Sequence, residues 1–159
     1  MIKIKKRLQK LKNLNELFTP CLILDENKFS KNIERLKSIV EQKNINFRPH
    51  LKTAKCIEIT KRFSEVFGKR AVVSTIEEIE KLKHCGINDF LYSVAIVPNK
   101  FDRIAQCLSE DCKISVLVDD ISIARKLVDF YKKTGLKIKA LIELDLDGHR
   151  SGVKSNSRE

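Results

Sequence analysis

Apolar runs and amphipathic stretches alternate along this chain at a nearly constant interval. The runs, rich in branched or apolar residues as strands are, cover 21–25, 46–51, 70–74, 89–94, 113–119 and 139–145. From the second run onward they start at residues 46, 70, 89, 113 and 139, in steps of 24, 19, 24 and 26. This repeat predicts successive β/α units in an α/β fold, either a (β/α) barrel or a doubly wound sheet.

The stretches between the runs carry helix signals. Residues 26–42 place apolar side chains on one helical stripe, formed by Phe29, Ile33, Leu36 and Val40. The stretch 120–135 ends in lysines and a glycine, which is a common helix stop. Ser74 or Thr75 is placed to cap a further helix, because glutamates follow in its first turn. The tetrapeptide 84–87 then ends that helix and leads into the next run.

Length and composition narrow the class of protein. A chain of 159 residues that is 42% hydrophobic can bury one ordinary core, so we expect one domain or part of one. No apolar run approaches the roughly 18 to 20 residues that a membrane-spanning helix needs. Five cysteines form no CxxC pair, and no secretory signal is evident, which favours reduced thiols and a cytoplasmic protein. No GxGxxG or Walker loop follows a run, so a nucleotide-binding sheet has little support.

The net charge of +11 raises the question of a nucleic-acid partner. Aromatic residues make up only 6% of the chain, and 21 acidic residues accompany the lysines along its whole length. This pattern indicates a lysine-rich solvated surface, with a nucleic-acid or membrane-surface module as the less favoured alternative. The basic excess is local only in residues 1–18, where no acid precedes Glu16. We expect a basic helix there that packs on its own domain; an organelle presequence and a membrane-surface helix are the alternatives.

Three cations alternate in the run 46–51 and just after it. Side chains two apart in a strand share a face, so Arg48, His50 and Lys52 are predicted to line one side. Phe47 and Leu51 line the other side. The proline at position 49 cannot donate a ladder hydrogen bond, so we expect a bulge or a strand end near it.

The last run offers carboxylates to complement these cations. Glu143 and Asp145 share a face near the carboxyl end of 139–145, and barrel active sites lie at that end. Buried cations need partners, so we expect Arg48 to pair with Glu143 or Asp145. An internal salt-bridge network without chemistry stays open as the alternative for these pairs.

The segments TPCLILDENKFSKNIERL, FRPHLKTAKCIEI, VSTIEEIEKLKHCGINDFLYS and IELDLDGHRSGV together resemble one family over about residues 17–153. They are similar to the pyridoxal-phosphate enzymes related to D-threonine aldolase and D-serine dehydratase, which share the alanine racemase N-terminal barrel. The most specific elements are RPHxKT and the later DxxxHRxG. The resemblance implies a partial (β/α)8 TIM-type barrel with about five of eight strands. It divides the chain into 1–18, 19–45 with a strand of a missing β domain, and 46–159 of the barrel.

The resemblance also implies a site. Lys52 corresponds to the lysine that forms the Schiff base with pyridoxal 5'-phosphate, and Arg150 to the arginine that reaches the phenolate side of its ring. His50 occupies the matching histidine position, with a role in positioning the cofactor or relaying a proton, or in packing. The chain differs from the family at Asp147, where a glycine is common.

The residues themselves fit this chemistry. A lysine in a partly dry site beside another cation favours its neutral form, which is nucleophilic toward an aldehyde. Lys52, freed as an amine, is then the natural base at the α-carbon. His50 and Lys52 are the predicted catalytic residues, and His50, Lys52 and Arg150 the predicted cofactor-binding residues. No metal ligand is predicted in the chain.

The implied function is the N-terminal part of a lyase that acts on D-amino acids. A racemase of the same fold and a non-catalytic cofactor-binding protein are the alternatives. Phosphate-binding loops and the ligands of a possible divalent metal are expected beyond residue 159. We therefore expect a small amino acid as substrate, a homodimer for a full-length protein, and no activity for these 159 residues alone.

Overall fold

The computed structural model describes residues 13–108, 111–146, 148 and 150–154. Its helices are α1 (Glu26–Gln42), α2 (Ile57–Phe67), α3 (Ile76–Lys83), α4 (Phe101–Cys107) and α5 (Ile121–Thr134). Its strands are β1 (Arg70–Val73), β2 (Asp89–Ala95), β3 (Lys113–Val118) and β4 (Lys139–Ile142). Short 3-10 turns cover η1 (Leu14–Glu16) and η2 (Pro98–Lys100).

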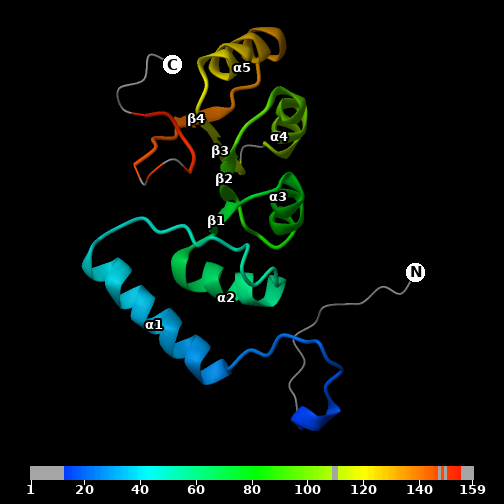
Figure 1. Ribbon diagram of the computed structural model, residues 1–159, viewed down its shortest axis with the longest axis vertical. Coiled ribbons are helices and arrows are strands. Elements are labelled where there is room, and N and C mark those ends of the chain that lie inside the picture. The colour runs from blue at the N-terminus through cyan, green and yellow to red at the C-terminus, as the bar shows by residue number, and fades with distance from the viewer. Residues whose placement is uncertain (1–12, 109–110, 147, 149, 155–159) are drawn as a thin grey trace.

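The strands form one parallel sheet in the order β1-β2-β3-β4, which is also their order in the sequence. Figure 1 shows α3, α4 and α5 along one side of this sheet, and the segment after β4 on the opposite side. A doubly wound sheet reverses its strand order and carries helices on both faces. Sequential order with the connecting helices on one face is the arrangement of a (β/α) barrel, so the fold is a partial barrel.

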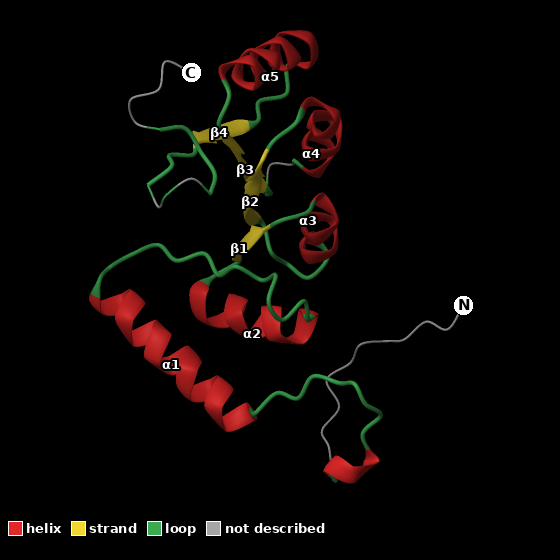
Figure 2. Cartoon of the chain, viewed as in Figure 1, coloured by secondary structure: helices red, strands yellow, loops and turns green. Residues whose placement is uncertain are grey.

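The core lies between the sheet and the helices on that side (Figure 2). Alternate strand residues point into it and are buried: Ala71, Val73, Phe90, Tyr92, Ile114, Val116 and Val118. Helices α3 and α4 cover them with Ile79 and Ile104, both fully buried. Burying a side chain of this size stabilises the fold by about 1.5–3 kcal/mol. The other strand face includes Val72, Leu91 and Ser115, which lie in register across β1, β2 and β3.

The helix signals of the sequence are confirmed. On the stripe of α1, Ile33 is buried, and the other three residues are half-buried. Thr75 is the residue that caps α3, in a capping box with Glu78. Helix α5 ends at Gly135, whose φ of 71° is the left-handed conformation that glycine adopts most readily.

Two predicted strands differ in the structure. The run 21–25 is not a strand among the described residues, and Leu22 is 95% exposed. A strand exists only through the hydrogen bonds of a neighbour, and no described segment pairs with this run. The run 46–51 is reduced to a single parallel bridge between His50 and Val72, because Pro49 has no N–H to donate.

The basic helix predicted over residues 1–18 lies mostly outside the described residues. Of this range the structure describes residues 13–18, which contain the 3-10 turn η1. No helix in the described part of the chain has the length and apolar composition that crossing a membrane requires.

Candidate active site

His50 lies beside β1, at the start of the barrel. The backbone N–H of Val72 donates to the carbonyl oxygen of Pro49 at 2.8 Å, and the N–H of Leu51 donates to the carbonyl oxygen of Val72 at 3.2 Å. Residues paired across a bridge share a face, so the predicted alternation holds: His50 lies on the face opposite to the helices. Phe47 points the other way and packs against Phe67, with 5.1 Å between ring centroids.

Two serines meet the imidazole of His50. Its Nε2 lies 3.5 Å from the hydroxyl oxygen of Ser74 and 3.4 Å from that of Ser93. Ser74 follows the last residue of β1, and Ser93 lies in the second half of β2. The cluster therefore forms at the carboxyl end of the parallel strands, where barrel enzymes carry their active sites.

The local sequence does not identify Ser74 and Ser93 as site residues. It predicts Ser74 only as a helix cap, and Ser93 lies inside an apolar run. The signal that identifies them is register. Ser74 and Ser93 stand two residues after the paired Val72 and Leu91, so they lie on the same inner face as those residues, one step closer to the carboxyl end.

The surroundings of His50 lower its pKa from the usual value. Desolvation by burial is the largest cause, and repulsion from Lys52 adds to it, whereas Glu78 acts in the opposite direction. Each of the first two effects disfavours the imidazolium. The side chain is therefore a neutral imidazole near neutral pH.

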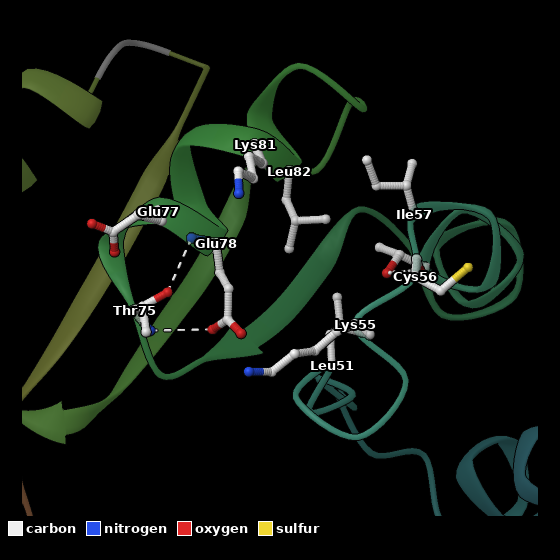
Figure 3. Close-up of a pocket in the computed structure, with 10 residues that line it drawn as sticks. Leu51, Lys55, Cys56, Ile57, Thr75, Glu77, Glu78, Lys81 and Leu82 are labelled. Atoms are coloured by element: carbon white, nitrogen blue, oxygen red, sulfur yellow. Dashed lines mark hydrogen bonds between the residues drawn. The ribbon is translucent and has the colours of Figure 1, made fainter. Parts of the chain in front are cut away.

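Glu78 organises the turn that carries Ser74. Its Oε2 accepts hydrogen bonds from the backbone N–H of Ser74 at 2.8 Å and of Thr75 at 3.1 Å. The Thr75 hydroxyl oxygen accepts one from the N–H of Glu78 at 3.2 Å. Figure 3 shows this reciprocal pair at the amino end of α3. Because Glu78 accepts hydrogen bonds from two consecutive amides, it fixes the backbone of the turn and so the position of Ser74 beside His50.

Lys52 lies in the turn over residues 51–54, directly after the bridge. Its side chain is exposed, and its backbone N–H donates to Nδ1 of His50 at 3.4 Å. No ion pair joins Lys52 to another described residue. A backbone contact thus joins Lys52 to His50, and the Lys52 side chain is exposed where the sequence predicts a partly dry site.

Lys55 occupies a different place. It lines a cavity of about 260 Å³ between the start of α2 and the start of α3, together with Leu51, Cys56 and Glu78 among others. Figure 3 shows its side chain extending toward the carboxylate of Glu78. The residues that line this cavity include neither His50 nor Lys52, and Leu51 among them packs against the core on the helix side of the sheet.

The predicted partner of Arg48 is wrong. Its guanidinium binds Asp89 at the beginning of β2, with Nη2 at 2.8 and 2.9 Å from the two carboxylate oxygens and Nε at 3.2 Å. It therefore points toward the amino end of the sheet, whereas Glu143 and Asp145 follow the carboxyl end of β4. The charge of Arg48 is neutralised away from the candidate site.

The segment after β4 folds back on itself. The N–H of Asp145 donates to the carbonyl oxygen of Val153 at 2.9 Å, and the N–H of Val153 donates to that of Glu143 at 2.8 Å. The Ser151 hydroxyl donates to the Glu143 carboxylate at 2.9 Å. Gly152 makes this return possible, because a Cβ there would lie 2.8 Å from the backbone oxygen of Glu143.

Arg150 is exposed in this returning segment. Between the described residues, no hydrogen bond or ion pair joins it to His50 or Lys52. His50 bridges to β1 whereas the segment of Arg150 follows β4, at the other end of the strand order. They share the carboxyl end of the strands. Two of the three predicted site residues are therefore in contact, and the third lies in the segment after the last strand without a described contact to them.

Comparison with known proteins decides the family. Residues 24–158 match the family described as alanine racemase, N-terminal domain. The chain belongs to this family. An alanine racemase-like protein from Idiomarina loihiensis superposes with a TM-score of 0.82 at 35% identity, over 89% of this chain and 38% of that one. The resemblance inferred from RPHxKT and DxxxHRxG is confirmed.

The similar relatives with named activities act on D-amino acids. The chain is 30% identical to D-threo-3-hydroxyaspartate dehydratase of Delftia sp. over 86% of its length. It is 29% identical to D-serine dehydratase of Dictyostelium discoideum over 89% of its length. D-threonine aldolase from Filomicrobium marinum superposes with a TM-score of 0.79 at 31% identity, over 89% of this chain and 38% of that one. The chain spans 36% and 38% of the length of the first two relatives.

Proposed function

We propose that the protein is a pyridoxal-phosphate-dependent lyase for D-amino acids that carry a hydroxyl group on the β-carbon. The related enzymes are named for D-threo-3-hydroxyaspartate, D-serine and D-threonine. All three substrates share the β-hydroxyl group and the D configuration. The substrate class of this protein follows from that shared chemistry, and the chain supplies the part of the enzyme that holds Lys52.

The observation that carries the proposal is the pair formed by Lys52 and His50 at the carboxyl end of the sheet. A primary amine without a carboxylate partner among the described residues stands two positions from a neutral imidazole. Two serine hydroxyls surround that imidazole. An amine, a neutral imidazole and hydroxyls on an inner barrel face fit an aldehyde cofactor, since the amine can bind it covalently while the others donate or accept hydrogen bonds.

The family and its D-amino-acid lyases depend on pyridoxal phosphate, which supplies an electron sink for bond cleavage at the α-carbon. Lys52 would hold this group through its Nζ, and as a free amine it accepts or returns the proton at the α-carbon. Arg150 contributes a fixed positive charge from the far edge of the same open end. An arginine can supply a charge that does not change with pH, because its guanidinium does not lose its proton in proteins.

Reduction with borohydride tests the assignment. The protein is incubated with pyridoxal phosphate, reduced and digested, and the pyridoxyl group is located by peptide mapping. We expect it on Lys52. Lys55 is the internal control, because it is three residues away and lines a cavity to which neither His50 nor Lys52 contributes. Labelling of Lys55 in preference to Lys52, or equal labelling of many surface lysines, would contradict the proposal. The variant Lys52→Arg should lose the specific label and keep its fold.

A further inference from the structure

The hydroxyl of Ser93 fixes the proton of the His50 imidazole. Ser93 donates its single hydrogen to the carbonyl oxygen of Val73, at 3.1 Å. Toward Nε2 of His50, at 3.4 Å, the same oxygen can therefore offer only a lone pair. Nε2 must then carry the hydrogen of that contact.

The second imidazole nitrogen leads to the same result independently. Nδ1 of His50 faces the backbone N–H of Lys52 at 3.4 Å. A backbone N–H can only donate, so Nδ1 has to be bare to accept from it. With hydrogen on Nδ1, as in the other neutral tautomer or in the imidazolium, the N–H of Nδ1 and the N–H of Lys52 would both be donors, and no hydrogen bond could form between them.

We propose that Ser93 holds His50 as the neutral tautomer with hydrogen on Nε2, and that His50 is a positioning residue that orients Lys52 through Nδ1. The part that concerns Lys52 rests on the proposed function; the tautomer does not. The route runs from the Val73 carbonyl through Ser93 and the imidazole to the amide of Lys52. His50 then acts on the backbone of the lysine, and relay of a proton is not its role.

The other groups near the imidazole agree with this assignment. Lys52 repels a positive charge on the ring, whereas Glu78 attracts it. However, Glu78 already accepts from the amides of Ser74 and Thr75, which holds its carboxylate at the turn. The Ser74 hydroxyl, 3.5 Å from Nε2, can donate to a bare Nε2 only if Nδ1 carries the hydrogen. The amide of Lys52 opposes that alternative.

Nitrogen NMR of the cofactor-free protein tests the tautomer. In protein labelled with ¹⁵N at histidine, long-range correlation spectra report which ring nitrogen carries hydrogen, and the signals that His50→Asn removes belong to His50. We expect hydrogen on Nε2. Ser93→Ala should move His50 toward a mixture of tautomers, Ser93→Thr should restore the wild-type pattern, and Ser74→Ala, the matched control, should leave it unchanged. Hydrogen on Nδ1 in the wild type would overturn the proposal, as would a Ser93→Ala spectrum identical to the wild type.

Two replacements of His50 test the positioning role. Asparagine places its amide oxygen near the position of Nδ1, so it can still accept from the Lys52 amide, whereas glutamine places its amide near Nε2. Using the borohydride assay, we expect the ratio of Lys52 to Lys55 label to stay near wild type in His50→Asn and to fall several-fold in His50→Gln. An equal fall in both variants would overturn the positioning role. Circular dichroism confirms that each variant is folded.

The two experiments fail separately. If the wild-type protein shows no specific label on Lys52, the proposed function is wrong, and the NMR result still decides the tautomer. If Lys52 is labelled and the tautomer differs from the one assigned, the proposed function stands and the route through Ser93 is wrong.

Discussion

The guanidinium of Arg48 binds both carboxylate oxygens of Asp89, at 2.8 and 2.9 Å, across the amino end of the sheet. Arg70 approaches the same carboxylate, with Nε at 3.8 Å. Asp89 therefore neutralises charge at the end of the sheet opposite to His50. Among the described residues, Arg48 and Arg70 therefore form their ion pairs with Asp89 and not beside Lys52 and His50.

Replacing Asp89 should destabilise the fold. Asp89→Asn removes the charge that two guanidiniums share, and both arginines are only partly exposed to water. We expect a loss of about 1–2 kcal/mol in the free energy of unfolding, measured by urea denaturation. The control is Asp129→Asn, at an exposed position of α5, which should change it by less than about 0.5 kcal/mol. Equal effects of the two substitutions would show that the Arg48 contact contributes nothing.

Which of these features could be predicted depends on how local the determining interaction is. The alternation of Phe47 and Leu51 against Arg48 and His50 follows from the period of an extended chain, and the structure has it. The caps of α3 and α5 likewise depend on a few consecutive residues. The partner of Arg48 depends instead on where strands far apart in the sequence come to lie, which charge alone does not specify.

The serines show the same limit. Ser74 and Ser93 approach His50 only because the bridge of His50 to Val72 aligns three segments at one level. A serine near a strand end is common, and its local pattern indicates a cap or a turn. The register that turns such serines into part of a site is a tertiary property. The strand predicted over 21–25 does not form among the described residues for a related reason, since a strand requires a partner and its expected partner belongs to the missing β domain.

The lowered pKa of His50 predicts a pH dependence of stability. The unfolded chain binds the proton at its usual pKa, near 6.5, and the folded protein binds it only at lower pH. Between these values the unfolded state holds more protons, so the free energy of unfolding falls as the pH decreases through about 6.5. Below the folded pKa the difference no longer grows.

Urea denaturation at about pH 7.5 and about pH 5.5 measures this effect. We expect the wild type to lose more stability between the two than His50→Asn does. His84→Asn, at an exposed position after α3, is the matched control for removing a histidine and should retain the wild-type loss. A wild-type protein with the same pH dependence as His50→Asn would contradict the prediction.

Gly152 should tolerate no side chain. Its φ of 91° disfavours other residues, and a Cβ would lie 2.8 Å from the backbone of Glu143 and Leu144. We expect Gly152→Ala to cost at least about 1 kcal/mol more than Gly148→Ala, because Gly148 has a similar φ and open space around it. Hydrogen exchange at the amides of Asp145 and Val153 should accelerate in Gly152→Ala alone. Equal costs would mean that the return of the Arg150 segment does not depend on this close approach.

Strand β4 should make these 159 residues associate when they are expressed alone. It pairs with β3 on one side, and no described strand lies on its other side. Ile142 is 75% exposed and Leu146 is 83% exposed. An open strand edge with apolar side chains offers backbone groups and apolar surface to another chain. Light scattering should therefore show species larger than a monomer.

A charge on that edge should reverse the association. Ile142→Lys places a lysine on the open strand, which is how natural edge strands avoid pairing, and we expect a larger monomer fraction at equal concentration. Val128→Lys is the matched control, because Val128 is also exposed, at 52%, but lies on the helix α5 and not on a strand. If both variants increased the monomer fraction equally, general charge repulsion would explain the result. A wild-type chain that is monomeric would show that the edge of β4 recruits no partner.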